Sequence, residues 1–164
     1  MIAQVGIIMG SDSDWPVMEA TVEALNLLNV SHEVTIVSAH RTPDRLMNYA
    51  KNARTRGLSV IIAGAGGSAH LPGMVAAITE LPVIGVPIVS TCLNGKDSLF
   101  SIVQMPRGVP VATVAINGAY NAGLLAAQII SINDDRLKDS IRHYKDQLSE
   151  HVLDKAKKIE SGFK

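Results

Sequence analysis

The stretch VGIIMGSDSDW, residues 5–15, decides what kind of fold this chain adopts. Its first five residues are apolar without alternation, which is typical of a strand that is covered on both faces. Gly10 and Ser11 then form a turn, and Trp15 and Pro16 begin a segment with the spacing of a helix. A buried strand that runs directly into a helix is the repeating unit of a parallel α/β sheet.

The same pattern recurs along the 164 residues. Strands are predicted at Gln4–Met9, Glu33–Val37, Val60–Ala63, Val83–Val86 and Val111–Ile116. Helices are predicted at Trp15–Leu28, Pro43–Thr55, Pro72–Thr79, Asp97–Gln104 and Ala119–Ile132. Right-handed crossovers then give a flavodoxin-like, doubly wound sheet of five parallel strands, in a three-layer α/β/α sandwich. No repeat or linker divides the sequence, so residues 1–164 are predicted to form a single α/β domain.

Residues 134–164 form a highly charged C-terminal extension that is predicted to be one long helix. Its apolar residues recur at steps of three and four and form one stripe: Leu137, Ile141, Tyr144, Leu148, Val152, Ala156 and Ile159. The stripe has two interpretations. The helix either folds back on its own sheet or reaches onto a neighbouring subunit.

The composition excludes several classes of protein. With 47% hydrophobic and 18% charged residues, the chain is expected to be globular and not disordered. Lys+Arg and Asp+Glu number 15 each, so no net charge attracts nucleic acid or an anionic membrane. No signal peptide and no apolar run of about 20 residues is present, so we expect a cytoplasmic protein. The single cysteine, Cys92, is expected to be buried and inert.

Ligands of doubly wound sheets bind at the carboxyl ends of the strands, where the strand order reverses. In the order 2-1-3-4-5 this point lies between the first and third strands. Three loops surround it: Gly10–Trp15, Ser38–Pro43 and Gly64–Gly73. Of all stretches of the sequence, they are the richest in residues that can bind a ligand or transfer a proton, so the site is predicted there.

The first of these loops combines hydroxyls with carboxylates. Ser11 and Ser13 offer hydroxyls and exposed backbone N–H groups that suit a phosphate, whereas Asp12 and Asp14 would repel it. The loop is therefore either only a helix cap, or it binds a ligand that has both a phosphate and a group that an aspartate can hold.

The second loop places Ser38, His40 and Arg41 together, before a helix that Thr42 is expected to cap. Arginine can bind a phosphate through two hydrogen bonds, and histidine can transfer a proton near neutral pH. His40 is therefore either a proton-transfer residue or an ordinary surface histidine.

The third loop, AGAGGSAHLPG at residues 63–73, is rich in glycine. The absence of side chains at Gly64, Gly66 and Gly67 indicates that a ligand or another segment approaches the backbone closely there. The spacing fits neither the dinucleotide fingerprint nor the P-loop. His70 is either a second proton-transfer residue or a histidine that only ends the helix.

The three loops together offer phosphate donors, a carboxylate suited to ribose hydroxyls, histidines, and room for a flat ring. The sequence has no metal-ligand cluster, no nucleophile with its base and no redox motif. This combination indicates a monophosphorylated ribosyl heterocycle and acid–base chemistry without a metal or cofactor.

Five segments resemble a known family: MGSDSDW, SAHRTP, AGAGGSAHLPGM, GKDSLFSIVQMPRGVPVATVAI and NAGLLAAQII. Together they resemble the N5-carboxyaminoimidazole ribonucleotide mutases of bacterial purine biosynthesis, over about residues 5–130. The resemblance implies conversion of N5-carboxyaminoimidazole ribonucleotide into 4-carboxy-5-aminoimidazole ribonucleotide without metal, ATP or biotin. It also implies a homo-octamer with active sites near the subunit interfaces.

The resemblance further implies a role for each matching residue. The phosphate would lie among Ser11, Ser13, Ser38 and Arg41, with Asp14 on the ribose hydroxyls and His40 as general acid and base. The imidazole and the migrating carboxylate would be lined by Gly64, Gly66, Gly67, Ser68, Ala69, His70 and Leu71, of which His70 is the second catalytic candidate. Asp12 receives no role and is expected to face solvent, and Tyr120 departs from the family pattern.

Two alternatives remain open at this point. The first is a carboxylase that adds carbon dioxide directly to aminoimidazole ribonucleotide, although its animal representatives lack the GGSAHLPG pattern with His70. The second is a non-enzymatic flavodoxin-like binding module. A receiver module needs an aspartate at the end of the third strand, where Gly64 and Ala65 stand, and a flavodoxin needs more aromatic residues than the 4% present here.

Overall fold

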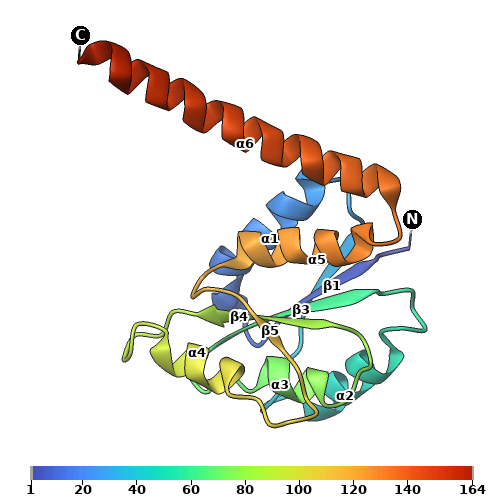
Figure 1. Ribbon diagram of the computed structural model, residues 1–164. Helices are drawn as coiled ribbons and strands as arrows, with labels where there is room; N and C mark the ends of the chain where they lie inside the picture. Colours follow the sequence, from blue (N-terminus) through green and yellow to red (C-terminus); the bar gives the residue numbers. More distant parts are fainter. Residues whose placement is uncertain (1, 164) are drawn as a thin grey trace.

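Within residues 2–163, which the computed structural model describes, five parallel strands form one sheet in the predicted order β2-β1-β3-β4-β5. The strands are β1 (Val5–Met9), β2 (His32–Ile36), β3 (Val60–Gly66), β4 (Val83–Ile88) and β5 (Ala112–Thr113). One face of the sheet is covered by α1 (Trp15–Leu27) and α5 (Ala119–Ser131) (Figure 1). The other is covered by α2 (Pro43–Asn52), α3 (Leu71–Ala76) and α4 (Lys96–Val103). The predicted three-layer sandwich is confirmed.

The central strands are covered on both faces, as their continuous apolar runs predict. Every residue of β1 and β4 is buried, and β3 is buried except at Gly66. The sheet therefore separates two cores, one against α1 and α5 and one against α2, α3 and α4. The edge strand β2 differs, because its Val34 and Ile36 are exposed.

Four strands differ in length from the prediction: β1 is one residue shorter and β4 two residues longer, and the larger differences are at β3 and β5. β3 continues three residues further, because Gly64, Ala65 and Gly66 still pair with β4. β5 is only two residues long, where six were predicted. The carbonyl of Gly85 in β4 accepts from Val114, so the backbone of Pro87, two residues on, also faces β5. Proline has no N–H, and the ladder therefore cannot continue there.

The helices α1 and α5 pack closely because the residues between them are small. An added Cβ at Gly123 would lie 2.8 Å from the Cβ of Ala24 and 2.9 Å from the carbonyl oxygen of Thr21. The hydroxyl of Thr21 donates to the carbonyl oxygen of Ala119 (2.9 Å), which joins the two helices directly. This contact holds together the layer that covers β1 and β3.

The long C-terminal helix α6 (Asp135–Gly162) only begins on this layer. Leu137, Ile141 and Tyr144 pack against the core, whereas Leu148 and most of the stripe beyond it are exposed. Figure 1 shows the helix projecting away from the sheet. The interpretation that the helix folds back on its own chain is therefore correct for the first half of the stripe. The second half is not covered by the chain itself.

Tyr120 lies at the start of α5, beside Tyr144 of α6, and does not line the pocket at the strand ends. Burial and the neighbouring Tyr144 hydroxyl raise the pKa of Tyr120 to about 12.

In the part of the chain that the structure describes, α6 included, no helix combines the length and the apolar character that crossing a bilayer requires.

The close contact between α1 and α5 predicts that Gly123→Ala destabilises the fold. The new methyl group meets backbone that cannot move aside without separating the helices, so we expect a loss of about 1–3 kcal/mol of unfolding free energy. Gly162→Ala is the matched control, because no atom lies within 4 Å of a Cβ there. Chemical denaturation should show no loss for this second variant, and equal losses in both would contradict the close-packing argument.

Candidate active site

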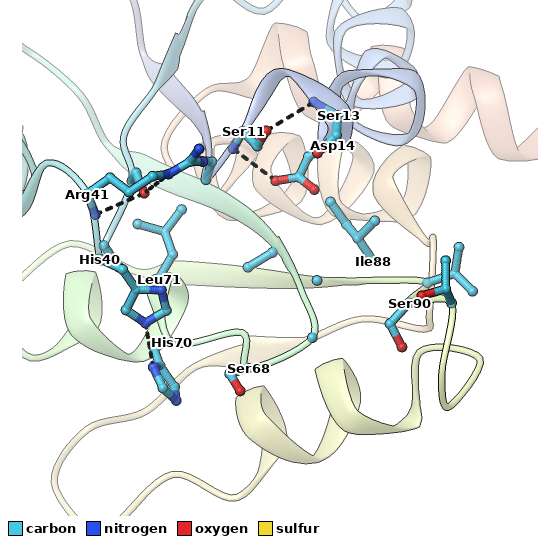
Figure 2. A pocket seen from close by; sticks show the side chains of 18 residues that line it. Ser11, Ser13, Asp14, His40, Arg41, Ser68, His70, Leu71, Ile88 and Ser90 are labelled. Atoms are coloured by element: carbon cyan, nitrogen blue, oxygen red, sulfur yellow. Dashed lines mark hydrogen bonds between the residues drawn. The ribbon is translucent and has the colours of Figure 1, made fainter.

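A pocket of about 460 Å³ opens at the carboxyl ends of the central strands (Figure 2). The loops after β1, β2 and β3 meet there, as the strand order predicts. A fourth segment, Ile88–Thr91 at the end of β4, closes the remaining side.

The loop after β1 caps a short 3₁₀ turn, whereas α1 itself has no side-chain cap. The N–H of Ser11 donates to Asp14 Oδ2 (3.1 Å), and the N–H of Ser13 donates to Ser11 Oγ (3.3 Å). This capping box begins a short 3₁₀ turn, Asp12–Asp14, which leads into α1. Asp12 is exposed as expected, and it accepts hydrogen bonds from Ser11 and Ser13. The backbone N–H groups that were expected to be free for an anion are therefore already engaged, although the hydroxyls line the pocket.

Asp14 is a buried carboxylate in the pocket wall, only 9% exposed. Figure 2 shows its carboxylate pointing into the pocket beside Ile88. Burial raises the pKa of the Asp14 carboxyl above its ordinary value, against the lowering effect of the Ser11 N–H and the Arg41 charge. Such a group favours a ligand that offers hydroxyl donors, because a donor compensates for the missing water.

Arg41 crosses from the second loop to the first. Its Nε donates to Ser38 Oγ (3.2 Å), and its Nη2 donates to the carbonyl oxygen of Gly10 (2.9 Å). Thr42 occupies the position before α2 but makes no side-chain cap, because its hydroxyl is bonded to the backbone of Ser38. The guanidinium thus places a fixed positive charge beside the serine hydroxyls.

The two candidate histidines form a hydrogen-bonded pair. His40 Nε2 and His70 Nδ1 lie 2.7 Å apart, with the rings nearly perpendicular at 87° (Figure 2). In such a bond one nitrogen donates and the other accepts, so the pair can carry at most one positive charge while the bond persists. An arrangement that holds either zero or one charge suits a group that gives and takes back one proton.

The third loop supplies a wall of glycines and small side chains. Gly66, Gly67 and Ser68 line the pocket, and Gly67 has a φ of +65°, a conformation that L residues rarely adopt. Two predicted lining residues lie elsewhere. Gly64 is still in β3, where an added Cβ would collide with the Met18 side chain, and Ala69 is buried in the core.

The fourth wall was not predicted. Ser90 and Thr91 follow β4, and the same strand-end rule that located the other loops could have found their hydroxyls. Ser90 donates to Asp97 Oδ1 (2.6 Å), and this bond holds the pKa of the Asp97 carboxyl below its ordinary value. Cys92 lies in the same loop and is exposed, so the prediction of a buried thiol is wrong. The loop extends over the surface, where no core is available to cover it.

The structure brings eleven of the thirteen predicted site residues into the lining of one pocket: Ser11, Ser13, Asp14, Ser38, His40, Arg41, Gly66, Gly67, Ser68, His70 and Leu71. Residues 2–163 contain no group of three His, Cys, Asp or Glu side chains that could hold a metal ion. The pocket therefore has serine hydroxyls and a cation at one side, a buried carboxylate at the rim of the first loop, and a histidine pair at the other side.

Comparison with known proteins identifies relatives along nearly the whole chain. Residues 4–151 match the family model described as AIR carboxylase. A Thermotoga maritima protein named N5-carboxyaminoimidazole ribonucleotide mutase is 62% identical, over 98% of this chain and 95% of its own length. A Schizosaccharomyces pombe protein named phosphoribosylaminoimidazole carboxylase is 60% identical over 95% of this chain, which spans only 28% of that relative. The crystal structure of Treponema denticola PurE superposes with a TM-score of 0.87 at 29% identity, covering 95% of this chain and 98% of that one.

The raised pKa of Asp14 predicts how Asp14→Asn changes stability with pH. A raised pKa means that the folded chain binds the proton more tightly than the unfolded chain, so ionisation of Asp14 costs stability as the pH rises. Asparagine keeps an acceptor for the Ser11 N–H but cannot ionise. We therefore expect a higher unfolding temperature than wild type at pH 7, with a difference that vanishes below about pH 4.

Calorimetry between pH 3.5 and pH 8 measures this difference, with Asp12→Asn in the exposed part of the same loop as the control. An Asp14→Asn protein that is less stable than wild type at pH 7, with a deficit that shrinks toward acid, would mean that the ionised Asp14 supports the fold.

Proposed function

The chain belongs to the AIR carboxylase family, and we propose that it is an N5-carboxyaminoimidazole ribonucleotide mutase of purine biosynthesis. It converts N5-carboxyaminoimidazole ribonucleotide into 4-carboxy-5-aminoimidazole ribonucleotide. The observation that carries this proposal is the 62% identity to a mutase of almost the same length. The reaction moves a carboxylate within one molecule, so the enzyme is an isomerase.

We propose that the phosphate of the ribotide binds between the first and second loops. The guanidinium of Arg41 supplies the positive charge there, and Ser11, Ser13 and Ser38 supply hydroxyl donors. Asp14 then accepts from the ribose hydroxyls, which explains why a carboxylate stands beside an anion site. The ligand has both a phosphate and a diol, so in this proposal the first loop serves in both ways: it caps the 3₁₀ turn before α1, and it contacts the ligand.

His40 is the proposed general acid and base. Cleavage of the bond between the exocyclic nitrogen and the carboxylate releases carbon dioxide, and that nitrogen takes up one proton. Attack of ring carbon C4 on the carbon dioxide forms the new bond, and C4 then loses one proton. The two transfers balance, so one histidine can donate in the first step and accept in the second. The 2.7 Å contact with His70 supports this role, because it orients the His40 ring.

The proposed place of the carbon dioxide is the side of the pocket formed by small and apolar residues. Gly66, Gly67, Leu71 and Ile88 leave room for a flat ring and offer few polar atoms to hold water. A confined gas molecule remains at high effective concentration beside C4, which favours recapture over escape. His70 stands at the same side, where we propose that it contacts the migrating carboxylate.

A direct carboxylase is the second candidate, because the fission-yeast relative carries that name at 60% identity. This chain spans only 28% of that protein, so that name describes a much longer chain. The mutase assignment is favoured by the relative of matching length.

We further propose that the chain is a single cytoplasmic domain that assembles as a homo-octamer. The assembly is supported by the exposed apolar residues on the second half of α6, of which Val152 is 63% and Ile159 is 62% exposed. A helix about 42 Å long that packs on its own chain only at its start offers its remaining stripe to another subunit. Light scattering on the purified chain measures the mass of the particle, and a monomer at micromolar concentration would contradict the proposal.

An isotope experiment tests the proposed function. N5-carboxyaminoimidazole ribonucleotide carrying ¹³C in its carboxylate is mixed with the enzyme in excess unlabelled bicarbonate. A mutase should form C4-carboxylated product that retains most of the ¹³C, because the carbon dioxide is recaptured before it leaves. A product that carries only unlabelled carbon would identify a direct carboxylase. A parallel sample contains aminoimidazole ribonucleotide and bicarbonate, and no product from either of the two ribotides would remove the enzyme assignment.

The proposed role of His40 predicts the behaviour of His40→Asn. Asparagine preserves the approximate size and one hydrogen bond but cannot transfer a proton near neutral pH. We expect a folded variant that still binds ribotide, with turnover reduced at least about 10²-fold in single-turnover assays. His143→Asn, on the exposed face of α6, is the control and should retain full activity. Near-normal turnover of the His40 variant would exclude His40 as the general acid and base and make His70 the leading candidate.

A further inference from the structure

Ser98 lies behind the pocket wall, and its hydroxyl joins two parts of that wall. The side chain is wholly buried near the start of α4. The hydroxyl accepts a hydrogen bond from the N–H of Gly67 (2.8 Å) and donates one to the carbonyl oxygen of Ile88 (2.6 Å). Gly67 and Ile88 both line the pocket, Gly67 from the loop after β3 and Ile88 from the end of β4.

This connection stands where the strand ladder ends. Gly66 and Ile88 are the last pair between β3 and β4. Gly67 then turns with its φ of +65°, and no ladder bond fixes the direction of the bend. His70 follows three residues later, at the start of α3. The Ser98 hydroxyl, which receives the Gly67 N–H, ties this bend to the end of β4 and so bears on the position of the glycine wall and of His70. The Gly67 carbonyl oxygen in turn accepts from the Ala69 N–H (2.9 Å) and from the Ser101 hydroxyl (3.5 Å).

We propose that Ser98 is a positioning residue for the reaction. By holding Gly67 against the end of β4, it sets the width of the pocket where the heterocycle lies and the distance from His70 to His40. Ser98 does not line the pocket and contacts no reacting atom. The kinetic consequence rests on the proposed mutase function, whereas the connection to Gly67 can be tested without it.

A hydroxyl that only stabilises the fold would behave differently, and Thr21 provides the comparison. It is equally buried, and its hydroxyl also donates to a backbone carbonyl, that of Ala119, between α1 and α5. Thr21 does not line the pocket and bonds to no lining residue. Thr21→Val therefore removes a buried hydroxyl without touching the bend, and Ser98→Ala removes one that holds it.

The experiment measures two quantities in Ser98→Ala, Ser98→Cys and Thr21→Val. The first is the hydrogen-exchange rate of the Gly67 amide by NMR, and the second is the separate change in kcat and KM. We expect Ser98→Ala to speed exchange at Gly67 at least about tenfold and to lower kcat about 10–10²-fold, because small misplacements of reacting groups have effects of this size. KM should change less than about threefold, because the phosphate contacts lie in other loops. Ser98→Cys keeps a weak donor and acceptor of similar volume, so its values should lie between those of Ser98→Ala and wild type.

Thr21→Val should lower the unfolding temperature and leave both quantities unchanged. A Ser98→Ala enzyme with wild-type kcat, or a kcat loss that Thr21→Val reproduces, would overturn the positioning role. Failure of both Ser98 variants to fold would also overturn it, because the hydroxyl would then serve the fold alone. If the wild-type enzyme turns over neither ribotide, the proposed function fails, and the exchange rate at Gly67 still decides whether Ser98 holds the bend.

Discussion

The parallel pairing of β1 with β3 is the constraint on which the site depends. Val5 lies opposite Val60 and Met9 lies opposite Gly64, so the two strands run level up to the end of β1. The chain then leaves β1 toward α1 on one face of the sheet and leaves β3 toward α3 on the other (Figure 1). Two neighbouring strands whose connections part to opposite faces open a crevice between them, and a single-residue change of register would misplace every group around it.

Much of this arrangement could be predicted from the sequence because it follows from local patterns. Continuous apolar runs identify the buried strands, and the loops that follow them must meet at one edge once the order 2-1-3-4-5 is assumed. What the sequence could not supply are contacts between distant residues. Gly64 looks like a ligand-contact glycine, but Met18, forty-six residues earlier in the chain, requires its missing side chain. The short β5 depends on the direction in which Pro87 faces, which only the register reveals.

The walls of the pocket share a further physical requirement. Backbone groups beyond the ends of the strands have left the ladder and take other partners. Side chains from elsewhere in the sequence provide them. The amide oxygen of Asn117, itself in the left-handed conformation, accepts from the N–H of Val89 (2.9 Å) beyond β4, and the hydroxyl of Thr42 bonds the backbone of Ser38 beyond β2. The site is thus built by polar side chains that complete the strand ends, and sequence periodicity carries no signal for them.

The position of Arg41 has a thermodynamic consequence for any anion that enters the pocket. A flexible arginine on a surface must give up rotamer entropy when it binds, on the order of 0.5–1.5 kcal/mol. Here the guanidinium is already held by Ser38 Oγ and the carbonyl oxygen of Gly10, so that entropy is lost when the chain folds and not when the anion arrives. The same two bonds leave the planar group with donors to spare, since a guanidinium has five N–H bonds. Association at this end of the pocket is therefore a docking onto a rigid charge, with little rearrangement to slow it.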